Sequence, residues 1–165
     1  MRPRLVVSFV LGLSSVVACG GSAPPAESAA SEPAPAAAPP AEAPVPANFA
    51  EQVARGQELY GAKCAGCHGA SGEGKAGGGP PVVGLDKGAL PLAPPATAKH
   101  RKTEFKTVAD IAEFVVKTMP PNAPGSLSAE DYYSILAFDL KANGIDLGDK
   151  KLDAELAKTL EVPRK

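Results

Sequence analysis

The chain has 165 residues and a formal net charge of −1, so its length allows one ordinary domain with additional segments, and its charge gives no reason to expect a nucleic-acid partner. Tryptophan is absent and aromatic residues make up 5% of the sequence, which leaves little area for a large aromatic core. The eighteen prolines and seventeen glycines are clustered, and each of the three cysteines has its own assignment below, so no disulfide is expected.

Residues 1–18 are predicted to be a secretory signal peptide. Two arginines near the start precede an apolar run from Leu5 to Val17, which is shorter than the roughly 20 residues that span a bilayer. The run ends in Val16-Val17-Ala18-Cys19, which resembles the lipobox of bacterial lipoproteins. The resemblance implies cleavage before Cys19 and lipidation of that residue, and therefore export and anchoring to a bacterial membrane. An ordinary signal peptide with an incidental cysteine, or an uncleaved anchor, is the alternative.

Residues 19–47 are predicted to be a flexible linker behind the lipidated Cys19. Between Ala23 and Ala47 the sequence holds eight prolines and eleven alanines, and few side chains are large enough to offset the entropy lost on ordering. Pro-rich chain favours an extended polyproline II conformation. We interpret the segment as a spacer that lets an anchored domain reach its partners, and simple filler between signal and domain is the alternative.

The folded domain is predicted over residues 48–147. Asn48 can cap a helix that runs from Phe49 or Ala50 to about Ala62. One face of this helix carries residues at helical spacing, namely Phe49, Val53, Gly56 and Tyr60. A glycine in mid-helix costs about 1 kcal/mol relative to alanine, which is reasonable where another helix must approach closely.

The segment Cys64-Ala65-Gly66-Cys67-His68 has the spacing of a c-type haem attachment motif. The two thiols can form thioether bonds to the two vinyl groups of one porphyrin, and His68 then falls beneath the ring as an axial ligand. A CxxC redox pair is less consistent with a helical pattern. A zinc site would need a fourth ligand, for which His100 is the only other imidazole.

Two further patterns follow the motif. Gly72, Gly74 and Gly77 form a formal GxGxxG, but the strand and helix that a dinucleotide-binding loop requires are not predicted around it, so we reject that function. The run Lys99–Lys102, with Lys106 beyond it, is the basic cluster of the chain. We interpret it as a solvated loop, with a docking patch for an acidic redox partner or a cover for haem propionates as alternatives.

The remaining sequence predicts three more helices. Thr107 and Asp110 form a capping box for a helix over about 108–117, which ends at Met119-Pro120-Pro121. Ser128 starts a second helix, from about Ala129 to Ala142, which Asn143-Gly144 ends. Residues 148–165 form a C-terminal tail with a short amphipathic helix around 153–160, which we expect to be docked on the domain.

The order of these segments resembles small monohaem class I cytochromes c of bacteria. The resemblance covers roughly residues 50–144 and rests on four segments: the helix Gly56–Tyr60 leading into Cys64–His68, then Gly79-Pro80-Pro81-Val82-Val83-Gly84, then Met119-Pro120, and then Ser128–Gly144 with Ala137-Phe138. It implies an all-α class I cytochrome c fold, in which the N-terminal and C-terminal helices cross beside one covalent haem. Gly56 and Tyr60 are then expected to pack near Ile135 and Phe138.

The resemblance also implies the roles of the site residues. Cys64 and Cys67 would hold one haem c covalently, with His68 as the proximal iron ligand. The carbonyl of Pro80 would accept a hydrogen bond from the His68 ring and fix its orientation. Met119 would be the distal iron ligand. A Trp that the family often places near the propionates is missing, so Arg101, Lys102 or a loop amide is left for that role.

Independently of the resemblance, Met119 is the one methionine after the initiator. A methionine that simply fills the core is the alternative, and His100 is the rival ligand.

These observations predict a membrane-tethered one-electron carrier rather than an enzyme, with redox proteins of unknown identity as partners and the haem domain in the periplasm or at the cell exterior. His/Met ligation leaves the iron no vacant position for a substrate. The alternatives are a haem subunit of a periplasmic oxidoreductase, or a gas-binding haem sensor if Met119 is not a ligand.

Overall fold

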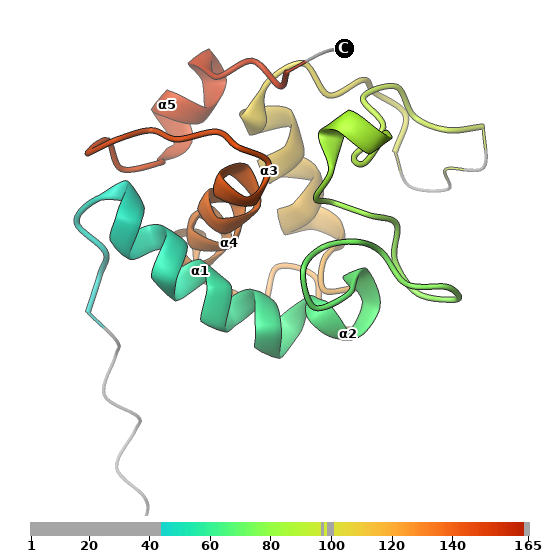
Figure 1. Cartoon of the computed structure of the whole chain (residues 1–165), viewed down its shortest axis with the longest axis horizontal. Helices are drawn as coiled ribbons and strands as arrows, with labels where there is room; N and C mark the ends of the chain where they lie inside the picture. The colour runs from blue at the N-terminus through green and yellow to red at the C-terminus, as the bar shows by residue number, and fades with distance from the viewer. Residues whose placement is uncertain (1–43, 97, 99–100, 164–165) are drawn as a thin grey trace, which may run out of the picture. The chain divides into compact units, whose positions relative to one another are not determined.

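The computed structural model describes residues 44–96, 98 and 101–163. The signal peptide, Cys19, most of the linker, Lys99 and His100 lie outside the described residues. The described part is helical, and its elements in chain order are α1 (Phe49–Lys63), α2 (Ala65–His68), the 3-10 turn η1 (Leu85–Lys87), α3 (Val108–Thr118), α4 (Ala129–Ala142) and α5 (Ala154–Thr159) (Figure 1). No helix among these residues is long and apolar enough to cross a bilayer. The predicted all-α class is confirmed.

The helices begin where the capping residues of the sequence place them. The Asn48 side chain accepts a hydrogen bond from the backbone N–H of Glu51, at 2.9 Å, and Ser128 accepts one from Asp131 in the same way. The predicted capping box of α3 is present, because Asp110 accepts hydrogen bonds from the backbone and the hydroxyl of Thr107.

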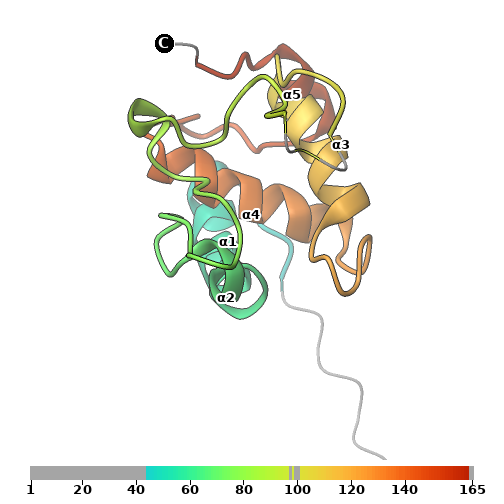
Figure 2. The ribbon, with the colours of Figure 1, turned by 90° about the vertical axis from the view of Figure 1, so that its right-hand side faces the viewer.

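The crossing of α1 and α4 is the main helix contact of the described domain (Figures 1 and 2). At Gly56 the two backbones are so close that a Cβ atom would lie 1.9 Å from the carbonyl oxygen of Ser134. One turn further, the rings of Tyr60 and Phe138 are in contact, with centroids 5.1 Å apart. The expected pairing of Gly56 and Tyr60 with the C-terminal helix is therefore present, although Ser134 rather than Ile135 meets the glycine.

The core lies between α3, α4, the start of α1 and the C-terminal segment. Its buried members include Phe49, Val108, Ile111, Leu136, Leu140, Leu152, Ala157 and Val162. Gln52 of α1 is buried and holds the C-terminal segment, because its side chain donates to the carbonyl of Leu152 and accepts from its N–H. An isolated bridge between Thr107 and Glu161 joins the start of α3 to the chain beyond α5.

Candidate haem site

The CAGCH segment lies at the junction of α1 and α2. Cys64 ends α1, where its N–H donates to the carbonyl of Tyr60 at 2.8 Å, and Cys67 and His68 belong to the single turn of α2. The thiol of Cys64 is half-buried and that of Cys67 is exposed, and both are free. Burial, followed by the charges of Asp139 and Cys67, raises the pKa of the Cys64 thiol to about 11.

The ring of His68 is fixed by the segment that follows it. Its Nδ1 lies 2.7 Å from the carbonyl oxygen of Pro80. Since a carbonyl only accepts, Nδ1 is the protonated nitrogen in the neutral ring, and the lone pair of Nε2 stays available to a metal. The contact predicted from the sequence between these two residues is present, and such a partner orients a ligating imidazole.

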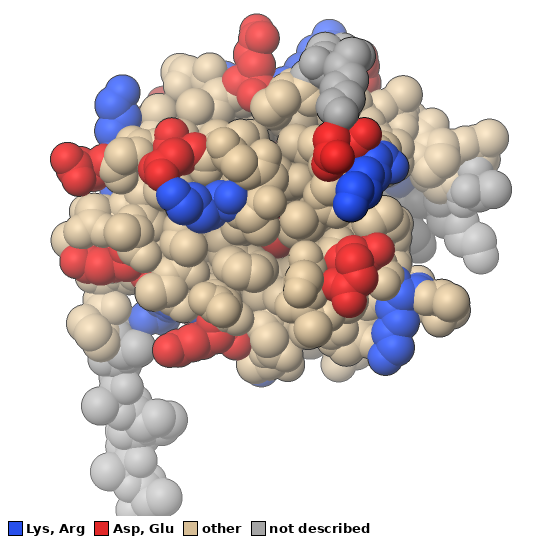
Figure 3. Space-filling view, in the orientation of Figure 1, with Lys and Arg blue, Asp and Glu red and all other residues tan. Residues whose placement is uncertain are grey.

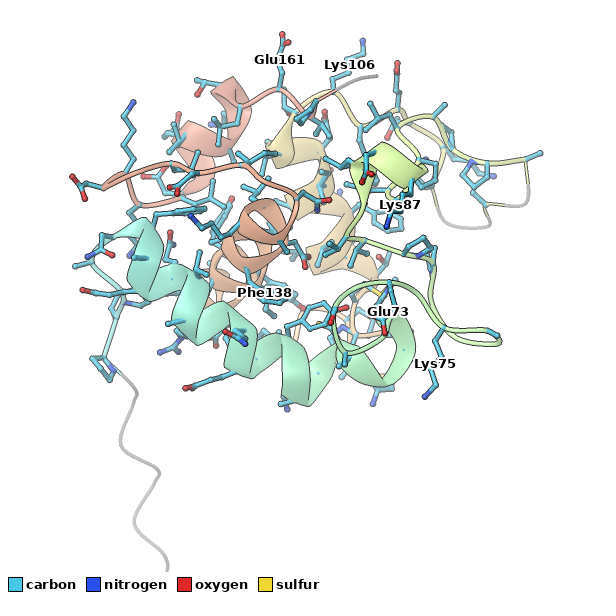
Figure 4. All side chains as sticks on the ribbon, in the orientation of Figure 1. Glu73, Lys75, Lys87, Lys106, Phe138 and Glu161 are labelled. Carbon is cyan, nitrogen blue, oxygen red and sulfur yellow. The ribbon has the colours of Figure 1, made fainter. Side chains whose placement is uncertain are left out.

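A glycine is needed beside that ring. A Cβ atom on Gly79 would lie 2.6 Å from Cε1 and 2.7 Å from Nδ1 of His68. The backbone of Gly79 is itself held, since its N–H donates to the carbonyl of Cys67 at 2.8 Å. The loop of residues 69–79 therefore wraps closely around α2, and Figure 4 shows Glu73 and Lys75 on this loop.

Replacing Gly79 by alanine is expected to displace the His68 ring and break its contact with Pro80. Loss of such a supporting contact typically costs 10–100-fold in metal affinity, so a haem-loaded Gly79→Ala variant should contain a high-spin fraction in its oxidised absorption spectrum. Gly66→Ala is the control, because a Cβ there meets nothing within 4 Å. If both variants keep the wild-type spectrum, Gly79 does not position the ring.

An apolar cavity lies beside the chain that follows Pro80. It has about 510 Å³ of space between atoms, part of it open to solvent. Its lining comes from the chain after Pro80, from α3, from α4 and from the C-terminal segment, and includes Val82, Leu85, Leu90, Ile111, Val115, Leu136, Asp139 and Leu140. Two thiols, an oriented imidazole and an aliphatic cavity together fit a covalently attached haem.

Met119 ends α3. Its N–H donates to the carbonyl of Val115 at 2.8 Å, and its own carbonyl accepts from the hydroxyl of Tyr132 at 2.7 Å. The residue is half-buried. Among the described residues that line the cavity neither Met119 nor His68 is found, so ligation by Met119 stays a prediction from the sequence.

Asp139 is a site residue that the sequence reasoning missed. It lines the cavity from α4, and its Oδ1 is buried without a hydrogen-bond partner. Burial raises the pKa of this carboxyl from 3.8 to about 7. The sequence does contain a sign of this residue. Asp139 is an acidic residue three positions after Leu136 and next to Leu140, on the apolar face of a predicted helix.

The interpretation of the basic cluster as a solvated loop is wrong for Arg101. This side chain is 7% exposed, donates hydrogen bonds to the carbonyls of Pro91 and Ala93, and stacks over the Phe105 ring at 4.1 Å. Arg101 therefore braces the loop before α3, and within the described cluster only Lys102 and Lys106 are exposed.

The zinc alternative gains no support from the described residues. In that part of the chain no three side chains of the His, Cys, Asp and Glu types gather closely enough to hold a metal ion. His100, the candidate fourth ligand, lies outside it.

Comparison with known proteins relates the chain to two sulfur-compound dehydrogenases. It is 35% identical over 90 residues to the thiosulfate dehydrogenase of Stutzerimonas stutzeri, a match that covers 52% of this chain and 26% of that protein. The crystal structure of the sulfane dehydrogenase SoxCD from Paracoccus pantotrophus is similar with a TM-score of 0.50 and 26% identity, over 72% of this chain and 60% of that chain. The chain thus spans less than two thirds of the length of either relative.

The strongest relation is to a family of haem proteins. The match runs from Glu51 in the first turn of α1 to Phe138 in α4, and so includes the CAGCH segment, Pro80 and Met119. Because residues 51–138 match the family described as cytochrome c oxidase, cbb3-type, subunit III, this chain belongs to that family of cytochrome c domains.

Proposed function

We propose that this chain is a membrane-tethered one-electron carrier, with a single haem c held by Cys64 and Cys67 and ligated by His68 and Met119. A cytochrome c domain is an electron-transfer module with covalently bound haem c. Our proposal adds three features to this family property: a single haem, the His68 and Met119 ligand pair, and the membrane tether. The observation that carries the proposal is the 2.7 Å contact of His68 Nδ1 with Pro80, which leaves Nε2 free to bind iron.

The haem, when bound, supplies a reversible one-electron couple. The protein's part is to orient the ligands and to exclude water. His68 is held by Pro80, and the backbone of Met119 is held by Val115 and Tyr132. The aliphatic cavity offers few polar groups that must reorganise when charge changes. If His68 and Met119 both held the iron, no position would be left for oxygen or substrate, and this pair of ligands would favour a raised potential.

The absorption spectrum of the oxidised, haem-loaded chain tests this function. We expect a low-spin ferric spectrum with a thioether charge-transfer band, and no binding of CO to the reduced protein. Met119→Ala should lose the band and bind CO, whereas Asn122→Ala, an exposed change in the same loop, should not. A high-spin wild-type protein that binds CO readily would contradict the carrier and favour a gas sensor.

A haem subunit of an oxidoreductase is the second candidate. It is supported by the two relatives, which are named a thiosulfate dehydrogenase and a sulfane dehydrogenase. The two functions can be separated by purifying the tagged full chain from solubilised native membranes and identifying bound proteins by mass spectrometry. A stoichiometric dehydrogenase partner would favour the subunit, and a chain without stable partner would favour the carrier.

The proposed partners are redox proteins that contact the domain briefly, because weak and small interfaces suit rapid electron exchange. Acidic and basic side chains are interspersed on the face drawn in Figure 3, which offers no broad surface of one sign there. We therefore expect association on this face to depend only modestly on salt.

The tether is proposed from the sequence alone. A lipidated Cys19 at a bacterial membrane would place the haem domain in the periplasm or at the cell exterior. Cys19→Ser is expected to move the haem-loaded protein from the membrane fraction to the soluble fraction, and Ser22→Ala is the control. If the Cys19→Ser protein stays in the membrane fraction, an uncleaved anchor replaces the lipid.

A further inference from the structure

Asp139 is an acidic group that the proposed carrier function does not use. Its Oδ1 is buried and has no hydrogen-bond partner, on the side of α4 that lines the cavity. Native proteins rarely leave a buried polar atom without a hydrogen-bond partner, so such an atom often indicates a functional role. The position is also beside the attachment site, because the charge of Asp139 acts on the Cys64 thiol and on the Tyr60 hydroxyl.

The cavity that Asp139 lines is otherwise mostly aliphatic. The side chains that share the cavity with it are aliphatic in the segment after Pro80 (Val82, Leu85, Leu90), in α3 (Val108, Ile111, Val115) and at the C-terminal segment (Val162). From α1, the titratable groups that face it are Tyr60 and Cys64, and the loop of residues 69–79 adds Glu73, whose charge acts on Tyr60.

Tyr60 has its own partner, since its hydroxyl donates to the carbonyl of Gly69 at 3.0 Å. The Cys64 thiol is consumed by a thioether bond in the loaded protein. One turn beyond Asp139, the C-cap residue Asn143 donates side-chain hydrogen bonds to the carbonyls of Val82 and Asp139. Its side chain also accepts from the backbone N–H groups of Gly84 and Leu85. Burial is the cause of the raised pKa of Asp139, and among the described residues no cation offsets it.

We propose that Asp139 binds one proton when the haem takes up one electron, so that this chain transfers an electron together with a proton. The inference rests on the proposed haem function. In the forward step, one electron from a one-electron donor reduces ferric iron to ferrous iron, and one proton from solvent water converts the Asp139 carboxylate to the acid. In the reverse step, the acceptor receives the electron and the proton returns to water.

The coupling follows from electrostatics in a poorly solvated site. A ferric haem carries one more positive charge than a ferrous haem, so it favours the carboxylate, and its reduction favours the neutral acid. Charges interact far more strongly in an apolar interior than in water. Burial also raises the pKa of this carboxyl to about 7, so the change of iron charge can move it between its two forms at ordinary pH.

The test is the reduction potential of the haem-loaded full chain, measured by spectroelectrochemistry between pH 5 and pH 9. We expect the potential to fall as pH rises, with a slope that approaches 59 mV for each tenfold change in proton concentration, about the value for one proton per electron. Asp139→Asn should flatten this slope over the range. Asp86→Asn removes an exposed carboxylate and is the matched control, which should keep the wild-type slope.

A second readout uses the unmodified protein, in case Asp139→Asn fails to load haem. Redox-induced infrared difference spectra at pH 7 should show a carboxylic-acid carbonyl band that appears on reduction. A wild-type potential that is independent of pH, or no such band, overturns the proposal, and so does a slope that Asp139→Asn retains. Failure of the haem function itself looks different, because the chain would then show no covalent haem or no reversible one-electron wave.

Discussion

Replacing Gly56 by alanine is expected to lower the free energy of unfolding by up to about 2 kcal/mol. The added Cβ would lie 1.9 Å from the carbonyl oxygen and 2.5 Å from the carbonyl carbon of Ser134, and 3.0 Å from Cβ of Phe138. The first two atoms are backbone, so they cannot rotate away, and α1 and α4 must separate. Overpacking of this kind costs about 1–3 kcal/mol and occasionally more, against a gain of about 1 kcal/mol in helix propensity.

The damage should extend to the haem site. Separation of α1 from α4 weakens the contact of Tyr60 with Phe138, which Figure 4 shows beside α1, and Tyr60 also donates to the carbonyl next to His68. Denaturant unfolding followed by far-UV circular dichroism measures the effect. Gly61→Ala is the matched control, because it lies in the same helix with nothing within 4 Å. It should gain up to about 1 kcal/mol, and equal effects at both positions would refute the close crossing.

Asp139→Asn is expected to stabilise the protein at neutral pH and to leave it unchanged in acid. Burial raises the pKa of Asp139 in the folded protein to about 7 from an ordinary 3.8. The folded state therefore holds a proton that the unfolded state has lost, and wild-type stability falls as pH rises from about 4 to about 7. At about 1.4 kcal/mol per pKa unit, the loss is on the order of 4 kcal/mol.

The Asp139→Asn variant has no carboxyl at this position, so its free energy of unfolding does not fall in this way as pH rises. Guanidinium unfolding of the haem-loaded chain, kept reduced, should show equal stability of the two proteins near pH 4 and a growing advantage of the variant up to about pH 7. In the oxidised protein the advantage should be smaller, since ferric iron favours the wild-type carboxylate. Asp86→Asn should show no such trend, and a parallel pH dependence of Asp139→Asn and wild type would disprove the burial cost.

The sequence determined where α1, α3 and α4 begin, whereas α2 and the 3-10 turn η1 were not predicted from it. Asn48, Thr107 and Ser128 carry the capping side chains, and the helices start one residue after each of them. These signals are local, because a cap bonds to backbone groups within three residues, and they can be read without the fold. The CAGCH segment is local for the same reason, since its chemistry is set by the spacing of adjacent residues.

The tertiary structure decided what depends on residues far apart in the chain. The burial of Asp139 results from the packing of α4 against α1, α3 and the segment after Pro80, and helix periodicity alone does not say whether a carboxyl reaches water. From the sequence Arg101 is expected to be a surface charge, whereas in the fold its side chain donates to the carbonyls of Pro91 and Ala93. The buried bond pair of Gln52 with Leu152, 100 residues apart, likewise exists only after folding. The local pattern thus predicts which groups carry the haem chemistry, while long-range packing sets their electrostatic surroundings. Solvation and charge proximity depend on distance in space rather than along the chain.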